Sequence, residues 1–578
     1  MIILGINAYH ADSSAAIFVN GKMIAAIEEE RFRRVKHWAG FPDLAINFCL
    51  QEAGIGYEQV DYFAIGRDPK AKFLKKILYL LKHPAGSFTV VKERFSNSKK
   101  AASIDIELSR LSGLPATTFT DKIKNIEHHR SHIASAFFAS PFDEAACLSI
   151  DGSGDFSTTM IGIGKGNDIK VLDSVDFPHS VGIFYTAFTQ LLGFPHYGDE
   201  YKVMGMAPYG EAKYVNELSD VVTLTDDGLF KLNMAYFRKG TQGIISYGED
   251  NMPVVAQLFS ALMVEKFGQP RKKDEELSQY HKDLAASVQR FTEKIIFHIL
   301  EHLYRRTGIE NICIAGGVAQ NSVANGKILA NTSFKNIYIP SAGHDAGISM
   351  GAALYTQHQL LQYKRQPAIL SAYTGSCYSN HQIKTVLAEK NIAFTELPDE
   401  QLFDTVTDCL INGGVAGWFT GRAEFGPRAL GGRSIIADPR RLDAKEILNT
   451  KIKRRESFRP FAPSILKEYV GEYFDIVDDV PFMEKVFPVK KDKQTLIPAV
   501  THVDGSGRLQ TVDAAVSPRY YHLIDCFRKK TGIPILLNTS FNENEPIVNT
   551  PMEALDCYLR TNMDMLVMEN ILISRLKS

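Results

Sequence analysis

The first residues of the chain alternate apolar runs of strand length with short polar turns. "MIILGIN" and "SAAIFVN" are two such runs, and the pair Asn20-Gly21 before a third run is typical of a hairpin turn. Residues 145–172, "AACLSIDGSGDFSTTMIGIGKGNDIKVL", repeat this order of strand, turn, strand, glycine hairpin and strand. The repetition predicts an internally duplicated α/β domain.

Helical and strand patterns alternate through the rest of the chain. Residues 127–140, "EHHRSHIASAFFAS", are typical of an alanine-rich helix, and residues 253–308 have helical periodicity. Two stretches with the order strand, turn, helix follow, "NICIAGGVAQNSVANGKI" and "NIYIPSAGHDAGISMGAALYTQHQLL". We predict one domain over 1–362 and a second α/β domain over 381–578, with 363–380 as the connector.

The charged residues nearly balance. With 65 basic and 66 acidic side chains the net charge is -1, so we predict neither nucleic acid nor a membrane as a partner, and any charged ligand must be bound locally. The seven cysteines lie far apart without a C-x-x-C pair, which favours reduced thiols in a cytoplasm. The longest uncharged apolar run, 180–195, is too short and too interrupted to span a bilayer. We expect a soluble cytoplasmic protein, whose oligomeric state the sequence does not indicate.

Three histidines lie within five positions at the start of the helix predicted over 127–140. Residues four apart share one helical face, so His128 and His132 could bind the same ion. His129 could pair only with His132, three positions further on. Spacing alone leaves the first ligand open, and an isolated pair of this kind more often lies at a helix surface without a metal.

Acidic residues at turns make a metal more plausible. Asp151 ends the strand that follows the histidine helix, and Asp345 follows another strand. Carboxylates at the carboxyl ends of strands face the crevice where α/β proteins bind ligands. Two imidazoles and one or two carboxylates describe a metal site able to polarise a substrate carbonyl. His10, in the turn after the first strand, would enter the same crevice if the two repeats face each other.

Glycines between a strand and a helix suggest a phosphate site. Gly316 and Gly317 would let the backbone approach a phosphate at a helix N-terminus, and Asn321 could hydrogen-bond a nucleotide. The pair of glycines is a weak signal alone, because it also suits a tight turn. The loop "DGSGDFSTT" in the other repeat has a similar phosphate-binding composition.

Basic residues gather in one part of the second domain. Between Arg422 and Arg459 there are eleven Lys or Arg against five Asp or Glu. Converging guanidinium groups suit a small dianionic ligand and a nucleotide, and Arg508 and the turn "LNTSFN" could complete such a pocket. A solvated charged face and a nucleic-acid patch are the competing interpretations. The interleaved Gly, Pro and apolar residues favour a pocket wall.

Six motifs together resemble one family, the O-carbamoyltransferases of the nodulation-protein and antibiotic-tailoring type (the NodU/CmcH family). They are, in chain order, "IEEERFRRVKHWAGFP", "HYGDEYKVMGMAPYG", "GGVAQN", "FGPRALGGRSI", "ESFRPFAPSIL" and "LNTSFN". The resemblance implies an N-terminal domain with the duplicated fold of actin, hexokinase and the chaperone ATPases, similar to the threonylcarbamoyltransferase that acts on tRNA. It also implies a C-terminal YrdC-like α/β domain.

The resemblance further implies a reaction in two steps. Carbamoyl phosphate and ATP, with Mg²⁺, would form carbamoyladenylate in the C-terminal domain. The adenylate would then pass to the N-terminal domain, where Fe²⁺ or a similar divalent metal assists transfer to a hydroxyl of a small-molecule natural product. Carbamoyl groups are poor acyl donors, and adenylation supplies a good leaving group.

The motifs also imply residue roles. By resemblance, the metal ligands are His128, His132, Asp151 and Asp345, and His10 lies beside the reacting acceptor as a candidate general base. Gly316, Gly317 and Asn321 resemble the adenylate-binding turn. The carbamoyl-phosphate and ATP contacts of the second site are implied to be Lys36, Arg428, Arg459, Arg508, Asn538 and Ser540, with Lys36 reaching across from the first domain.

The first turn departs from the family pattern, and the acceptor is not specified. Many members have "HDASAA" or "HDSSAA", whereas this chain has "HADSSAA" with Ala11 inserted, which affects the placement of His10. Family acceptors include antibiotic sugars, cephems, lipo-oligosaccharides and saxitoxin-type alkaloids. The segments 60–120 and 180–275 match no motif and are expected to shape the acceptor pocket. Two rival interpretations are a small-molecule kinase on the same fold and a tRNA-modifying or RNA-binding protein.

Overall fold

The structure is a computed structural model that describes residues 1–82, 103–238, 245–248, 250–476 and 478–575. The chain forms two compact units, residues 1–324 with 328–369, and residues 325–327 with 370–578. The border after Ile369 falls within the stretch 363–380. Among the described residues, none of the helices combines the length and the apolar character needed to cross a bilayer.

The first sheet of unit 1 has five strands in the order β3-β2-β1-β4-β5. Strands β1, β2 and β3 are antiparallel neighbours, whereas β4 and β5 run parallel to β1. Asn20 and Gly21 both have positive φ, 48° and 87°, which confirms the predicted hairpin turn between β2 and β3. The strand bounds are β1 Ile2–Asn7, β2 Ser14–Val19, β3 Lys22–Glu28, β4 Tyr62–Ile65 and β5 Ile123–Asn125.

The second sheet of unit 1 repeats this topology. Its order is β14-β13-β6-β7-β8, with β6, β7 and β8 antiparallel and with β13 and β14 parallel to β6. The duplication predicted from the sequence is therefore confirmed, and unit 1 has the duplicated α/β fold of the actin and hexokinase type. The strand bounds are β6 Glu144–Gly154, β7 Ser157–Lys165, β8 Asp168–Asp176, β13 Asn311–Ala315 and β14 Asn336–Tyr338.

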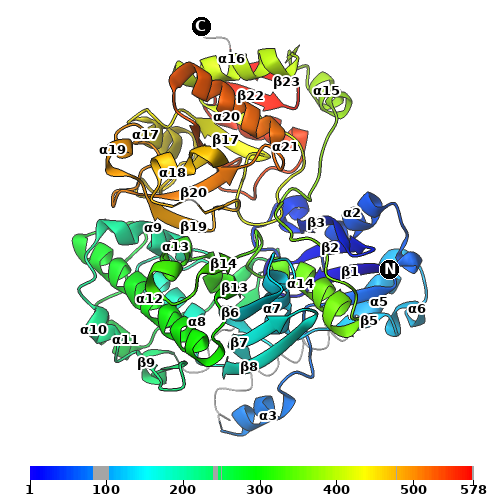
Figure 1. Ribbon diagram of the computed structural model, residues 1–578, viewed down its shortest axis with the longest axis vertical. Helices are drawn as coiled ribbons and strands as arrows, with labels where there is room; N and C mark the ends of the chain where they lie inside the picture. Colours follow the sequence, from blue (N-terminus) through cyan, green and yellow to red (C-terminus); the bar gives the residue numbers. More distant parts are fainter. Residues whose placement is uncertain (83–102, 239–244, 249, 477, 576–578) are drawn as a thin grey trace. The chain divides into compact units, whose positions relative to one another are not determined.

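Helices α7 (His128–Phe137) and α14 (Gly347–Tyr355) occupy equivalent places, each after the fifth strand of its repeat. They pack directly on each other, and α7 also lies against β6 (Figure 1). The contact depends on glycine, because a Cβ added at Gly351 would lie 1.9 Å from the carbonyl oxygen of Ser131. A Cβ at Gly5 of β1 would likewise lie 1.9 Å from the carbonyl oxygen of Ser349. Both helices are thereby held close to the strands of the two repeats.

The region 253–308 is not one continuous helical segment. It contains β12 (Pro253–Val255), α11 (Ala261–Phe267) and α12 (Gln279–Thr307), and α12 packs against α8 (Val181–Leu191) and β6. Gly268 ends α11, and a polar stretch separates it from α12. The other elements of unit 1 are α1 Glu30–Arg33, α2 Asp43–Ala53, α3 Phe73–Lys82, α5 Ile104–Ser112, α6 Thr117–Thr120, α9 Glu200–Met206, α10 Val215–Leu218, α13 Ser322–Asn331, β9 Val222–Leu224, β10 Phe230–Leu232 and β11 Ile245–Tyr247.

Unit 2 is built on one mixed sheet of nine strands in the order β15-β23-β22-β16-β17-β21-β18-β20-β19. The strands are β15 Thr395–Glu396, β16 Ala416–Phe419, β17 Arg433–Ala437, β18 Ala462–Leu466, β19 Lys485–Pro488, β20 Ser506–Val512, β21 Ile535–Ser540, β22 Met565–Met568 and β23 Ile571–Ser574. The helices are α15 Asn380–Glu389, α16 Asp399–Ile411, α17 Ala444–Ile447, α18 Val470–Tyr473, α19 Lys491–Gln494, α20 Pro518–Thr531 and α21 Pro551–Arg560. One hydrophobic core, which includes Trp418 and Phe541, underlies this sheet.

The contact between α7 and α14 gives a stability prediction. Gly351→Ala should lower the free energy of unfolding by about 1–3 kcal/mol, because the new methyl group forces the two helices apart. Denaturant unfolding of the purified chain measures it. Gly152→Ala is the matched control, since a Cβ there meets no atom within 4 Å. Equal stability of the two variants would show that the helices are not in close contact.

Candidate metal centre and anion site

Four side chains from both repeats of unit 1 converge on one point. His128 and His132 lie on one face of α7, whose first turn is capped by the Glu127 carboxylate accepting from Arg130 N at 2.8 Å. Asp151 lies on β6, and Asp345 lies two residues before α14. All four residues are buried. Elements that are far apart in the sequence therefore bring the predicted group together.

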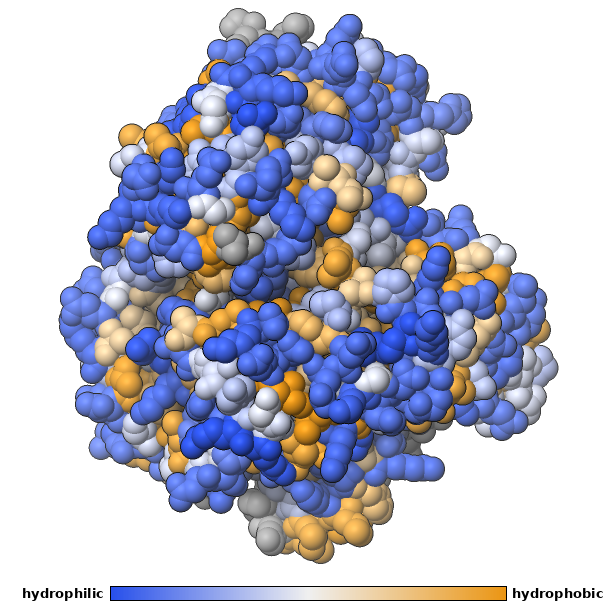
Figure 2. All heavy atoms as spheres, in the orientation of Figure 1, coloured by the Kyte–Doolittle hydropathy of each residue, from blue (hydrophilic) through white to orange (hydrophobic). Residues whose placement is uncertain are grey.

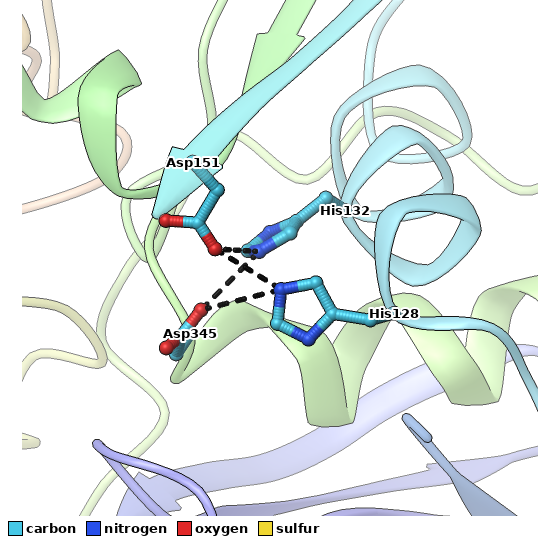
Figure 3. A group of neighbouring side chains, drawn as sticks. All are labelled: His128, His132, Asp151 and Asp345. Atoms are coloured by element: carbon cyan, nitrogen blue, oxygen red, sulfur yellow. Dashed lines mark hydrogen bonds and ion pairs between the residues drawn. The ribbon is translucent and has the colours of Figure 1, made fainter. Parts of the chain in front are cut away.

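The distances within the group are short (Figure 3). His128 Nε2 lies 3.0 Å from Asp151 Oδ2 and 3.8 Å from Asp345 Oδ1. His132 Nε2 lies 3.5 Å from Asp151 Oδ2 and 3.3 Å from Asp345 Oδ1. One ligand atom from each of the four residues lies within 4.8 Å of the others. This spacing matches four donors arranged around one ion.

His129 does not join this group. Its Nδ1 lies 2.7 Å from the hydroxyl oxygen of Ser149, and its ring is fully buried. Burial holds the pKa of His129 well below the ordinary histidine value, and the neighbouring imidazoles add to the effect. The choice that spacing left open is thus decided by geometry, because His128 is the residue that faces the same point as His132.

Hydrogen bonds orient the Asp151 carboxylate and fix the loop that carries Asp345. Gly317 N donates to Asp151 Oδ1 at 3.0 Å, which leaves Oδ2 facing the histidines. Asn7 Nδ2 donates to the carbonyl oxygens of Asp345 at 3.0 Å and of Ala11 at 3.1 Å. The turn after β1 is thereby tied to the loop that carries Asp345.

Burial and charge act against each other in this group. Burial lowers the pKa of His132, but the Asp151 and Asp345 carboxylates outweigh burial and raise the pKa to about 9. Burial alone would raise the pKa of Asp151, yet the two imidazoles hold it well below its ordinary value. Burial and the charge of Asp151 would raise the pKa of Asp345, but His10 and His132 lower it. Both carboxylates are therefore ionised at neutral pH and offer two negative charges to a cation.

The residues fit a divalent metal. His132 Nε2 and Asp345 Oδ1 are buried and, although 3.3 Å apart, make no hydrogen bond of acceptable geometry with each other or with another described residue. Buried polar atoms that lack partners are costly unless a ligand satisfies them. Two imidazoles and two carboxylates are also a common donor set for divalent transition metals.

His10 lies beside this group despite the inserted Ala11. Its Nδ1 is 2.8 Å from Asp345 Oδ2, and its ring centroid is 5.1 Å from that of His128. Its side chain is partly exposed, whereas Ala11 is fully buried. A residue in this position can exchange a proton with a ligand that occupies the centre.

The turn of Gly316 and Gly317 lies against β6 near Asp151. Gly316 has φ of 103°, and a Cβ there would lie 2.2 Å from the carbonyl oxygen of Ile150, so only glycine fits. Asn321 caps α13 by accepting from Ala324 N at 3.0 Å, and its Nδ2 donates to Gln289 Oε1 at 2.9 Å. The Asn321 amide therefore already has partners within the protein, and its role in adenylate binding stays a prediction.

A further group in unit 1 was missed by the sequence analysis. Asp12, Glu30 and His37 each place one ligand atom within 4.8 Å of the others. His37 Nδ1 lies 2.7 Å from Asp12 Oδ1, and this carboxylate raises the pKa of His37 to about 9, although burial opposes it. Glu30 and His37 belong to the motif "IEEERFRRVKHWAGFP", which was the available signal.

Arginines of unit 2 form a strongly positive cluster around Arg508 on β20. Burial, followed by the charges of Arg428, Arg455 and Arg459, holds the pKa of Arg508 well below its usual range. Arg508 Nε is buried and has no hydrogen-bond partner among the described residues. Such a cluster is suited to a polyanionic ligand. Arg455 was missed as a member, and its only sequence signal was its position in the basic stretch.

Asn538 and Ser540 lie on β21 of the same unit. Asn538 is buried, and its Nδ2 donates to Ala429 O at 3.2 Å and to Ser464 Oγ at 3.1 Å. Ser540 Oγ lies 3.4 Å from Nζ of the buried Lys453, which also donates to Asn542 O at 2.8 Å. Lys453 is a buried cation that the sequence analysis did not single out.

Another arginine of unit 2 has a structural role, and one predicted contact stays open. Arg433 is fully buried, donates to the carbonyl oxygens of Thr420 and Ser376 at 3.2 and 2.8 Å, and lies over the Phe419 ring. It therefore cross-links backbone segments. Lys36 lies in unit 1, in the segment after α1, so its predicted contact with the second site stays a prediction. Residues 83–102, part of the expected acceptor segment 60–120, lie outside the described residues.

Family models match most of the chain. Residues 2–354 match the model described as carbamoyltransferase N-terminus, and residues 407–575 match carbamoyltransferase C-terminus. The chain belongs to the carbamoyltransferase family. The N-terminal match contains the group of His128, His132, Asp151 and Asp345, and the C-terminal match contains the arginine cluster.

Curated relatives agree with this assignment. An uncharacterized protein of Synechocystis is 43% identical over 99% of this chain and 96% of its own length. The nodulation protein NolNO of Sinorhizobium fredii is 36% identical over 98% of this chain and 80% of its own length. Among solved structures, HypF of T. kodakarensis has 16% identity and a TM-score of 0.32 over 63% of this chain and 48% of that chain. A TM-score this low supports no further conclusion.

The raised pKa of His132 predicts a pH-dependent stability of the metal-free carbamoyltransferase. The folded pKa of about 9 lies above the ordinary value of 6.5, so the stabilisation is fully present below pH 6.5 and is lost as the pH rises through 9. The melting temperature of the chelator-treated chain should fall over this window. His132→Asn should flatten the profile, and an unchanged profile in this variant would contradict the assignment.

Proposed function

We propose that this carbamoyltransferase is an ATP-dependent O-carbamoyltransferase. In the proposed reaction, carbamoyl phosphate, water and ATP form carbamoyladenylate in the C-terminal domain and release phosphate and pyrophosphate. The N-terminal domain then transfers the carbamoyl group to a hydroxyl of a small-molecule natural product. The observation that carries the proposal is the buried group of two histidines and two aspartates within residues that match the carbamoyltransferase N-terminus.

The arginine cluster of unit 2 supports adenylate formation in the C-terminal domain. Carbamoyl phosphate and the triphosphate of ATP are both polyanions, and ATP would enter with Mg²⁺. We assign their binding to Arg428, Arg459 and Arg508, together with Asn538, Ser540 and Lys36. The buried Nε of Arg508 lacks a protein partner among the described residues, so an anionic ligand would satisfy it.

The group of two histidines and two aspartates, His128, His132, Asp151 and Asp345, supports the transfer step in the N-terminal domain. Fe²⁺ or a similar divalent ion, when bound by these four residues, supplies a Lewis acid that polarises a carbonyl oxygen. The acceptor hydroxyl oxygen forms a bond to the carbamoyl carbon, and the bond from that carbon to the phosphate oxygen of AMP breaks. AMP leaves with the electron pair of that bond.

His10 is the residue we assign to proton transfer. The attacking hydroxyl must lose its proton, and His10 is the partly exposed imidazole next to Asp345. The Asp345 carboxylate, 2.8 Å from His10 Nδ1, stabilises the imidazolium that results. The backbone of Gly316 and Gly317 and the side chain of Asn321 would hold the adenylate beside this pair.

A mutation of the histidine helix separates the two steps. His132→Ala should lower metal affinity by more than about a hundredfold and abolish transfer, because it removes a direct ligand. Pyrophosphate release from ATP and carbamoyl phosphate should persist. Metal content by mass spectrometry and pyrophosphate release are measured on the same preparation. His129→Ala, on the same helix, should keep its metal, and metal retained in His132→Ala would refute the assignment.

A mutation in the arginine cluster tests the first step. Arg459→Ala should reduce pyrophosphate release by about tenfold to a hundredfold, because a charge-assisted contact to the anionic substrates is lost. The metal content of unit 1 should stay unchanged. Arg454→Ala is the control, since the Arg454 side chain is 61% exposed and pairs with Glu543. Equal rates for Arg459→Ala and the wild type would remove Arg459 from the site.

The nucleotide product separates this proposal from a kinase on the same fold. AMP and pyrophosphate, with an acceptor that gains the mass of one CONH group, are the expected products. ADP and a phosphorylated acceptor would instead support the kinase. A panel of hydroxylated natural products analysed by mass spectrometry would also identify the acceptor class.

A further inference from the structure

Helix α3 (Phe73–Lys82) presents its apolar side chains to solvent. Leu74 and Leu81 are 75% and 73% exposed, and Phe73, Ile77 and Leu78 are the other exposed apolar side chains that the structure describes in this helix. Figure 2 shows hydrophobic spheres gathered at the place where Figure 1 draws α3. Most exposed apolar side chains on soluble proteins are scattered singly, so five on one short helix need an explanation.

These five residues form one continuous stripe. Positions 73, 74, 77, 78 and 81 follow the spacing that places side chains on a single helical face. An ordinary surface helix would turn such a stripe toward the protein core. In α3 the stripe faces outward.

The opposite side of α3 holds the helix on unit 1. The Tyr79 ring contacts the rings of Phe156 and Phe177, with centroids 5.8 and 5.5 Å apart. Lys75 Nζ lies 2.6 Å from Asp176 Oδ2, and Lys72 Nζ donates to Ser174 Oγ at 2.8 Å. The helix is therefore anchored through its aromatic and basic side, which keeps the apolar stripe exposed.

The segment around the stripe is also strongly basic. Residues 70–82 contain five lysines and neither Asp nor Glu, although the whole chain has a net charge of -1. Asp176 pairs with Lys72 and Lys75 and reduces this formal charge of +5 to +4. The positive charge is local, and the net charge of the whole chain, from which we predicted no membrane partner, does not reveal it.

We propose that α3 is a membrane-surface anchor that lies in the interface of a bilayer containing anionic lipids. An exposed apolar stripe flanked by lysines is the pattern of helices that bury one face among the acyl chains and keep their basic residues at the headgroups. The helix lies on the bilayer and does not span it. The enzyme is thereby placed at a membrane surface.

The local charge favours a lipid surface over a second copy of the chain. A symmetric contact between two α3 stripes would bring two segments of the same positive charge together. An anionic lipid layer offers both an apolar interior for the leucines and negative headgroups for the positive charge that Asp176 does not neutralise. One surface therefore satisfies both features of the helix.

Vesicle sedimentation with the purified chain tests this anchor. Vesicles of phosphatidylcholine with about 30% phosphatidylglycerol should bind the chain at least about tenfold more tightly than phosphatidylcholine alone. The triple variant Leu74→Ser, Leu78→Ser, Leu81→Ser should lose at least about tenfold in affinity for the anionic vesicles. Leu442→Ser, at a leucine of unit 2 that is 84% exposed, is the matched control and should bind like the wild type.

Pyrophosphate release and the melting temperature of the triple variant establish that it is folded. Wild-type binding to anionic vesicles that is lost in the folded triple variant supports the anchor. Absence of wild-type binding, or equal binding of the wild type and the triple variant, overturns it. Concentration-dependent dimerisation of the wild type that the triple variant abolishes, without vesicle binding, would assign the stripe to a second copy and also overturns it.

Discussion

The close contact between α7 and α14 is the constraint on which the candidate centre depends. Gly351 brings the two helices so near that a single methyl group would overlap the Ser131 carbonyl. His132 lies one residue beyond Ser131 on α7, and Asp345 lies just before α14 begins. If the helices moved apart, the imidazoles and this carboxylate would no longer reach the same point. Glycine at one buried position therefore determines the geometry of a site made of other residues.

The duplicated fold explains how unlike residues come to share that site. Asp151 belongs to the first strand of the second repeat, and His10 lies in the turn after the first strand of the first repeat. His128 begins the helix after the fifth strand of one repeat, while Asp345 precedes the corresponding helix of the other. Corresponding regions of the two repeats thus carry histidine on one side and aspartate on the other. The duplicated scaffold therefore carries an asymmetric set of donors, as the proposed cation binding and proton transfer require.

Features that depend on local sequence patterns could be predicted here, and features that depend on long-range packing could not. The hairpin at Asn20 and the helical spacing of the histidines are local properties, so they could be predicted. The exclusion of His129 depends on Ser149, twenty positions away on β6, and no local pattern contains that hydrogen bond. The arginines show the same division, because Arg433 and Arg455 lie in the same basic stretch of the sequence. Only the tertiary structure separates the one that cross-links carbonyl groups from the one inside a positive cluster.

Electrostatic effects in this chain are set by local charge and not by its total. The Debye length at physiological ionic strength is about 8 Å, so charges spread over a protein of this size are screened from one another. Lysines within one short helix act on a nearby surface together, whatever the remaining residues carry. The buried aspartates of unit 1 also act locally, because salt screens buried charges much less than exposed ones. A net charge of -1 is therefore compatible with a cation site, an anion site and a basic apolar helix in the same molecule.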